Sequence, residues 1–245
     1  MESRRKKPVL VSLHALGGYL YGSVPFVDLL AKSRGIDLKK AGSKNVGAAN
    51  LFSLSKSLPL ATAAWTLDLS KGAMPPLIAK TVLRKDEKTA RMAAAAGAVF
   101  GVAGQCWPIF LSFSGGRGVA PIIGASLILA PGLAPCLLAM MASARLARFL
   151  PVLKGEVRAE KRELLHLQTK HTKSGPLSVA LAISLMPALC AVKGHEREVV
   201  LATAANAAIM LLRRLTAQPL PGKPGDQGVK RILINRLLYD RDTSG

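Results

Sequence analysis

Four long stretches without a charged side chain constrain this chain more than any other feature of its sequence. They cover residues 8–27, 92–116, 118–144 and 174–192. A helix of about 18 to 20 apolar residues is long enough to cross the hydrocarbon core of a bilayer. Each stretch is near or above that length, whereas a shorter one at 199–212 spans only with help from its flanks. The pattern predicts a helical membrane protein.

The charge balance is strongly basic, with 34 Lys and Arg against 14 Asp and Glu. In a soluble protein this excess would indicate nucleic acid, but we find no basic patch interleaved with aromatic residues, and we expect no nucleic-acid partner. In a membrane protein the same excess indicates cytoplasmic loops that face anionic lipid. The basic segment 145–173 is therefore predicted to be cytoplasmic. The basic start of the chain and the loop after the first span both look cytoplasmic, so the orientation of the N-terminus stays open.

The composition argues against several kinds of site. The three cysteines lie singly within apolar runs, and the sequence has no CxxC pair and no His-Cys cluster. We therefore expect neither a metal site nor a disulfide framework, and no cofactor. The four histidines are scattered, so a serine-histidine-acid triad is not expected either.

A glycine-rich segment, FSGGRGVA at 113–120, separates two of the apolar runs. Arg117 is its only charge and stands beside Gly115, Gly116 and Gly118. Glycine lets a phosphate approach the backbone N–H groups, and arginine supplies a forked cation for its oxygens. The segment is thus either an anion cradle at the membrane boundary or a turn between helices whose arginine stays among the headgroups.

Three further polar islands lie at the ends of apolar runs. Ser23 is followed by Pro25, a loop at 32–50 is rich in Lys, Gly and Asn, and Asp68 and Lys71 interrupt the apolar pieces 51–67 and 72–83. We interpret the last as a broken or re-entrant helix pair. Each island also has a simpler explanation: a serine bonded to its own helix, a solvated turn and an ion pair on one helix face.

The order and spacing of these islands form a recognisable pattern. GSVPF at 22–26, DLKKAGSKNVGAANLF at 37–52, LDLSKG at 67–72 and GQCWPIFLSFSGGRGVAP at 104–121 resemble the bacterial acyl-phosphate-dependent glycerol-3-phosphate acyltransferases. The resemblance covers about the first half to two thirds of the chain. It implies a polytopic helical bundle that transfers an acyl group from acyl phosphate to the sn-1 hydroxyl of glycerol-3-phosphate, giving lysophosphatidate for phospholipid synthesis.

The resemblance also implies a set of site residues. The catalytic residues would be Ser23, Lys39 and Arg117. The substrate-binding residues would be Ser43, Asn45, Gly47, Asn50, Asp68, Lys71, Gly115, Gly116, Gly118 and Ser178. Gln105 stands where the family has histidine, and the family's C-terminal His and Asn are absent near 212–215. A non-catalytic diverged homologue, or a membrane carrier for a phosphorylated solute, is therefore the alternative.

We accordingly expect an all-α fold, a polytopic transmembrane bundle of about six to seven spanning or half-spanning helices with re-entrant loops. Residues 1–217 would form the acyltransferase-like domain, and 218–245 a Pro/Gly linker with a basic amphipathic tail. The resemblance places the protein in the inner (plasma) membrane as a multi-pass protein with its active site facing the cytoplasm. Its partners would be acyl phosphate, glycerol-3-phosphate and membrane lipids, with a monomer as the working expectation.

Overall fold

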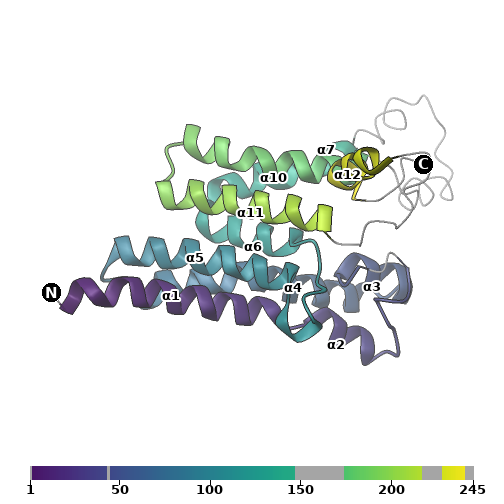
Figure 1. The fold of residues 1–245 in the computed structure, drawn as a ribbon, viewed down its shortest axis with the longest axis horizontal. Helices are drawn as coiled ribbons and strands as arrows, with labels where there is room; N and C mark the ends of the chain where they lie inside the picture. Colours follow the sequence, from purple (N-terminus) through teal and green to yellow (C-terminus); the bar gives the residue numbers. More distant parts are fainter. Residues whose placement is uncertain (1, 43–44, 147–173, 217–227, 241–245) are drawn as a thin grey trace.

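The computed structural model describes residues 2–42, 45–146, 174–216 and 228–240. In these ranges the chain forms a bundle of α-helices and no strand (Figure 1). The all-α prediction is confirmed. The α-helices are α1 Glu2–Ser23, α2 Phe26–Lys32, α3 Ala48–Ser55, α4 Leu58–Val82, α5 Glu87–Cys106, α6 Val119–Leu129, α7 Ala134–Leu146, α10 Ser174–Val192, α11 Arg197–Thr216 and α12 Gly228–Tyr239, with short 3-10 turns at Ile109–Leu111 and Pro131–Leu133.

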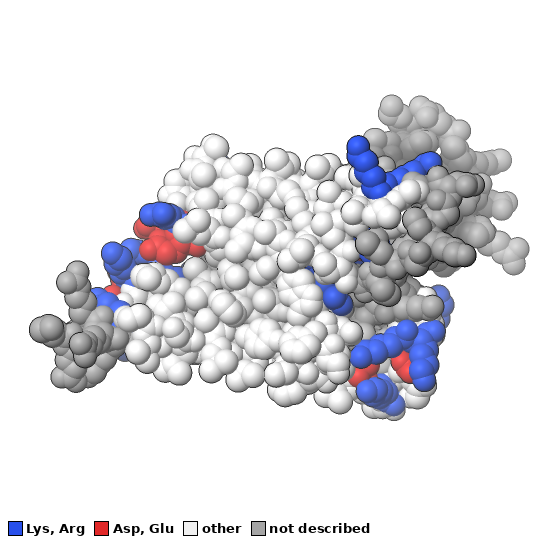
Figure 2. All heavy atoms as spheres, viewed as in Figure 1, with Lys and Arg blue, Asp and Glu red and all other residues white. Residues whose placement is uncertain are grey.

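Four segments are long and apolar enough to cross a membrane: Lys7–Lys32, Glu87–Leu111, Gly175–Val192 and Arg197–Thr216. The last of these runs beyond the uncharged stretch 199–212, so its flanks do complete a span. Figure 2 shows Lys, Arg, Asp and Glu gathered at the two ends of the molecule, with a broad band largely free of charge between them. Such a band is what the hydrocarbon core of a bilayer requires.

The predicted break at Asp68 and Lys71 does not exist. Helix α4 runs without interruption from Leu58 to Val82, and the chain breaks instead before it, where Lys56 adopts a left-handed conformation with φ 54°. Asp68 and Lys71 lie three residues apart on one face and pair with each other inside the bundle. Because the two charges neutralise each other, the helix can remain continuous.

The apolar run 118–144 forms two helices and not one span. Helix α6 ends at Leu129, the 3-10 turn Pro131–Leu133 follows, and α7 begins at Ala134. Pro131 disfavours helix at the preceding residue, and Gly132 adds little helix propensity. Each of the two pieces is shorter than a full crossing. A run without charge therefore indicates burial in the membrane but does not fix where a helix ends.

Helices α1 and α5 approach each other closely because both carry glycine on the facing side. A Cβ atom on Gly18 would lie 2.5 Å from the carbonyl oxygen of Gly97, and one on Gly22 would come closer still to that of Gly101. Small residues four positions apart let two membrane helices pack backbone against backbone. This contact brings the C-terminal ends of α1 and α5 together.

Two hydrophobic clusters flank those helix ends. The larger one joins α5, α6, α7, α10 and α11, and the smaller one packs α2 and α3 with the first half of α4. Helix α12 lies against α10 and α11 (Figure 1). The basic loop is predicted at 145–173, but α7 runs to Leu146, and the rest of that loop, 147–173, lies outside the described residues. So does the linker at 218–227.

We expect Gly18→Ala to destabilise the bundle because its Cβ would lie 2.5 Å from a backbone oxygen of α5. Overpacking of this kind costs about 1–3 kcal/mol, which lowers the melting temperature by several degrees in a thermal unfolding experiment in detergent. The neighbouring Gly17→Ala is the control, since nothing lies within 4 Å of that Cβ. Equal melting temperatures for the two variants would contradict the close contact between α1 and α5.

Asp86 links the start of α1 to the start of α5, at the opposite end of these two helices from Ser23 and Cys106. Its Oδ2 lies 2.8 Å from Lys7 Nζ, and Oδ1 accepts a hydrogen bond of 3.2 Å from the Thr89 N–H at the start of α5. The Lys7 ammonium, followed by the hydroxyl and N–H of Thr89, lowers the pKa of the Asp86 carboxyl to about 2.

This carboxyl gives a stability that depends on pH. A carboxyl whose pKa is lower in the folded state stabilises the fold above its unfolded pKa of about 3.9, and the contribution is lost as the pH falls. For Asp86 the loss should run from about pH 4 down to about pH 2. Thermal unfolding of Asp86→Asn should therefore show a shallower pH dependence in that window than the parent chain. Identical slopes would be the contrary result.

Candidate active site

A pocket lies where the C-terminal ends of α1 and α5 meet α4 and the glycine loop, which we define as residues 113–118. It is lined by Ser23, Val24, Pro25, Val27, Val46, Asp68, Lys71, Gln105, Pro108, Leu111, Gly115 and Gly116. Three of the four polar islands of the sequence thus contribute polar groups or glycine backbone, and the fourth contributes Val46. Residues of all four islands thus meet at this space, which we call the polar pocket, although of the three predicted cations only Lys71 lines it.

Ser23 sits at the last position of α1 and is fully buried. Pro25 disfavours helix at Val24, which explains why α1 stops there and α2 begins at Phe26. The Ser23 hydroxyl donates a hydrogen bond of 2.8 Å to the carbonyl oxygen of Tyr19. With its proton used in this way, the Ser23 oxygen is left as an acceptor at the wall of the polar pocket.

The Lys71 ammonium is held from three sides. It donates a hydrogen bond to Gln105 Oε1, lies 3.1 Å from Asp68 Oδ1 and stands 5.4 Å from the centre of the Phe26 ring. Lys71 is 2% exposed and Asp68 is 3% exposed. Lys71 and Asp68 form an ion pair, but their atoms are not aligned for a hydrogen bond. Asp68 Oδ1 has no hydrogen-bond donor in the described part of the chain.

The glycine loop is fixed to α5 and α11 by its own backbone. The Gly116 N–H donates to the Gln105 carbonyl oxygen at 3.0 Å. From α11, the Arg213 guanidinium donates from Nη2 to the Gly115 oxygen at 2.8 Å and from Nε to the Gly116 oxygen at 3.2 Å. The Gly116 oxygen and the Arg117 N–H belong to one trans peptide and point in opposite directions. Because Arg213 binds that oxygen, the Arg117 N–H points away from the Arg213 guanidinium.

Gly115 and Gly118 occupy positions that no other residue fits easily. A Cβ atom on Gly115 would overlap the Gln105 carbonyl oxygen. Gly118 begins α6 with φ 76°, a left-handed conformation in which glycine is least strained. The loop is therefore both a helix-to-helix connection and a segment whose bare backbone faces the polar pocket.

The Arg117 side chain turns away from the polar pocket toward the C-terminal helix. Its Nε donates to Asp240 Oδ1 at 2.6 Å, just beyond the end of α12. Arg117 is not among the residues that line the polar pocket. Its guanidinium thus pairs with Asp240 and not with a group of the pocket wall.

In the described part of the loop before α3, Val46 is the residue that lines the polar pocket. The Asn50 amide donates to the carbonyl oxygens of Leu38, Ala41 and Asn45 at 3.1–3.2 Å. Gly47 is the residue before α3, and Asn45 Oδ1 is buried without a partner among the described residues. Lys39 is exposed and away from the pocket lining. Ser43 lies outside the described residues.

Ser178 belongs to a different part of the molecule. Its hydroxyl lies near the start of α10 and donates to the carbonyl oxygens of Met141 and Gly175 at 3.1 and 2.9 Å. It lines neither the polar pocket nor the second cavity described below. The structure therefore gives Ser178 a role in packing α10 on α7.

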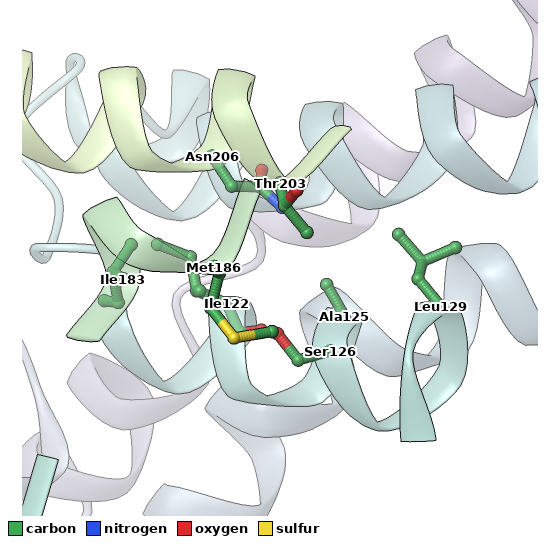
Figure 3. A pocket seen from close by; sticks show the side chains of 8 residues that line it. All are labelled: Ile122, Ala125, Ser126, Leu129, Ile183, Met186, Thr203 and Asn206. Carbon is green, nitrogen blue, oxygen red and sulfur yellow. The ribbon is translucent and has the colours of Figure 1, made fainter. Parts of the chain in front are cut away.

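The second cavity lies between α6, α10 and α11 (Figure 3). It is lined by Ile122, Ala125, Ser126, Leu129, Ile183, Met186, Thr203 and Asn206. The hydroxyls of Ser126 and Thr203 donate to carbonyl oxygens of their own helices. No charged residue lines this cavity, so it does not suit a phosphorylated ligand.

Three residues outside the predicted set help to build the site. They are Gln105, which accepts from Lys71; Arg213, which orients the glycine loop; and Asp240, which pairs with Arg117. Arg213 directly follows the uncharged stretch 199–212, and this position is the sequence signal that could have indicated it. No pattern in the sequence points to Asp240, because 123 positions separate it from Arg117.

The polar pocket and the glycine loop suit a ligand that carries both a negative charge and hydroxyl groups. The Lys71 ammonium and the arginines near the glycine loop provide positive charge, and the loop provides backbone N–H groups. Ser23 and Asp68 provide acceptors for hydroxyl protons at the pocket wall. Among the described residues, no group of three His, Cys, Asp or Glu could hold a metal ion.

Comparison with known proteins gives one family. The family model for glycerol-3-phosphate acyltransferase matches residues 12–154. A glycerol-3-phosphate acyltransferase from Rubrobacter xylanophilus is 40% identical over 125 residues, which are 50% of this chain and 59% of that protein. One from a Jannaschia species is 40% identical over 131 residues, 52% of this chain and 61% of that protein. The matched segment thus spans about three fifths of the length of these relatives.

Solved structures show the same fold over nearly the whole chain. PlsY (YgiH), an integral membrane glycerol 3-phosphate acyltransferase in its glycerol 3-phosphate form, superposes with a TM-score of 0.65 at 24% identity. The match covers 95% of this chain and 94% of that one. The lysophosphatidic acid form of that protein gives a TM-score of 0.62 at 23% identity. At this identity the likeness is one of fold.

We expect Lys71→Met to destabilise the protein by about 3–5 kcal/mol, because it leaves the Asp68 carboxylate buried without its cation. The double variant Asp68→Leu/Lys71→Met removes both charges and should recover most of that loss. Chemical unfolding in detergent measures both free energies. A double variant as unstable as the single one would show that the ion pair is not what holds α4 at this point.

Proposed function

The chain belongs to the glycerol-3-phosphate acyltransferase family, and we propose that it transfers an acyl group from acyl phosphate to the sn-1 hydroxyl of glycerol-3-phosphate. The products are lysophosphatidate and inorganic phosphate. The single observation that carries this proposal is the polar pocket, where Ser23, Lys71 and the backbone of Gly115 and Gly116 face one another.

The reaction needs charge stabilisation more than strong base catalysis. The sn-1 oxygen attacks the acyl carbon, the bond from that carbon to the phosphate oxygen breaks, and the departing phosphate takes the hydroxyl proton. Acyl phosphate has a good leaving group, so a histidine base is not needed, in keeping with Gln105 at that position. Positive charge and N–H groups at the glycine loop would stabilise the oxyanion and the leaving phosphate.

Each polar group of the site has a distinct part in this scheme. Lys71 neutralises phosphate charge in the polar pocket. Arg117, which pairs with Asp240 outside that pocket, would turn toward the glycine loop to hold a phosphate by its forked guanidinium. Ser23 and Asp68 accept hydrogen bonds from glycerol hydroxyls, which orients the attacking oxygen. Lys39, exposed on the loop before α3, attracts anionic substrates toward the entrance.

The remaining predicted residues support these groups. Asn45, Gly47 and Asn50 would shape the loop at the mouth of the polar pocket, and Gly118 would set the start of α6. Ser43 and Ser178 are the remaining members of the predicted substrate-binding set, with Ser178 fixing α10 against α7. The segment 1–217 would form the catalytic domain, and 218–245 its linker and tail.

We propose that the protein works in the plasma membrane with the polar pocket open to the cytoplasm, where glycerol-3-phosphate is soluble. The acyl chain of the donor would lie among the spans, beside the apolar lining residues Val27 and Leu111. We further propose that the protein acts as a monomer.

We expect Arg117→Ala to lower kcat/KM for acyl transfer by about 100-fold or more, since it removes a cation that acts on the transition state. Arg117→Lys should keep part of the activity, because it retains the charge and loses the fork. Ser23→Ala removes one orienting acceptor and should cost about tenfold. The measurement is lysophosphatidate formation from acyl phosphate and labelled glycerol-3-phosphate.

Cys136→Ala is the matched control for that series, because Cys136 is exposed on α7 and away from the polar pocket. It should leave turnover unchanged. Full turnover in both Arg117→Ala and Ser23→Ala would remove the assignment of these residues to the site.

A further inference from the structure

Asp240 brings a carboxylate to the arginines that surround the glycine loop. Its Oδ1 lies 2.6 Å from Arg117 Nε, and both side chains are mostly buried, at 25% and 16% exposed. Arg213 and Arg214 also lie here and are 6% and 3% exposed. In the part of the chain that the structure describes, no other carboxylate forms an ion pair with these three arginines.

Among the residues that the structure describes, the arginines therefore carry more charge than their surroundings neutralise. Arg213 donates to the carbonyl oxygens of Gly115 and Gly116, and Arg214 donates to those of Pro176 and Leu237. Carbonyl oxygens satisfy the hydrogen bonds of a guanidinium but bring no negative charge. Within the described ranges, three cations thus face one carboxylate, and buried charge of one sign favours an anionic ligand.

Asp240 occupies only part of the Arg117 guanidinium. Its contact is to Nε, and within the described ranges neither Nη1 nor Nη2 of Arg117 has a hydrogen-bond partner. These two nitrogens form an edge that binds two oxygens of a phosphate at once. A phosphate at that edge would lie close to the Asp240 carboxylate, and the two like charges would repel each other.

The docking of α12 holds Asp240 in this place against the preference of its backbone. Asp240 follows α12 with φ 55°. This left-handed conformation costs energy for residues other than glycine, less so for Asp and Asn. Arg214 Nη1 binds the Leu237 oxygen at 2.9 Å, and Arg236 Nη1 binds the Leu215 oxygen at 3.1 Å. These bonds fix the end of α12 beside Arg117.

We propose that Asp240 is an internal anion that occupies Arg117 in the empty protein, and that a phosphate group must compete with it. Asp240 thereby sets how tightly the glycine loop binds phosphate. The inference rests on the proposed function for the identity of the natural phosphate compound. Removing the carboxylate leaves the arginines without their internal counter-ion, so phosphate should bind more tightly.

The test measures the reactivity of Arg117 in the purified full-length protein. Phenylglyoxal modifies free guanidinium groups, and mass spectrometry locates the modified residue. In Asp240→Asn, a variant that tolerates the left-handed backbone, Arg117 should be modified several-fold faster than in the parent chain. Inorganic phosphate should protect it at a concentration about tenfold lower, and the difference should shrink at high salt.

Two further variants make the result unambiguous. Asp86→Asn removes the same charge just before the start of α5, at the end of that helix away from the glycine loop, and it should not change the modification of Arg117. Asp240→Gly suits the left-handed backbone at this position and should behave as Asp240→Asn does, even if the asparagine variant folds poorly.

Three outcomes overturn the inference: equal modification of Arg117 in the parent chain and the Asp240 variants, an unchanged or higher protecting concentration of phosphate, or no protection in any of them. Turnover is measured separately with acyl phosphate and glycerol-3-phosphate. If modification shifts as expected while the parent chain shows no acyl transfer, then the inference about Asp240 stands and the proposed function fails.

Discussion

The rest of this structure depends on how the protein holds the buried ammonium of Lys71. A lysine in the middle of a membrane helix is costly unless groups of the protein surround it. Here Asp68, Gln105 and Phe26 do so, and they come from α4, α5 and α2. Three separate elements must therefore meet at one point. The space left at that meeting point is the polar pocket, so the neutralisation of one charge also defines the site.

Close helix contacts make this meeting possible. The facing glycines of α1 and α5 bring the end of α1, with Ser23, beside the end of α5, with Gln105. Gln105 then contributes twice, since its side chain accepts from Lys71 and its backbone oxygen accepts from Gly116. The same residue links the buried cation to the glycine loop. The buried cation and the glycine loop thus belong to one short hydrogen-bond network.

The sequence predicts much of this site because lipid leaves few places for polar residues. Ser23, Lys71 and the glycine loop stand out at the ends of uncharged runs, and they do line one pocket. What the sequence could not predict depends on tertiary partners. The unbroken course of α4 follows from pairing within the bundle, and the approach of Arg213 to the loop follows from how α11 packs. The pairing of Arg117 with Asp240 depends on where α12 docks.

The most direct test of the account is the release of inorganic phosphate from acyl phosphate by the purified protein, with and without glycerol-3-phosphate. A site that grips two phosphorylated compounds and joins them should release phosphate only when both are present, in a one-to-one ratio with lysophosphatidate. Release that does not depend on glycerol-3-phosphate, or no release under either condition, would contradict the claim that the polar pocket is an acyl-transfer site.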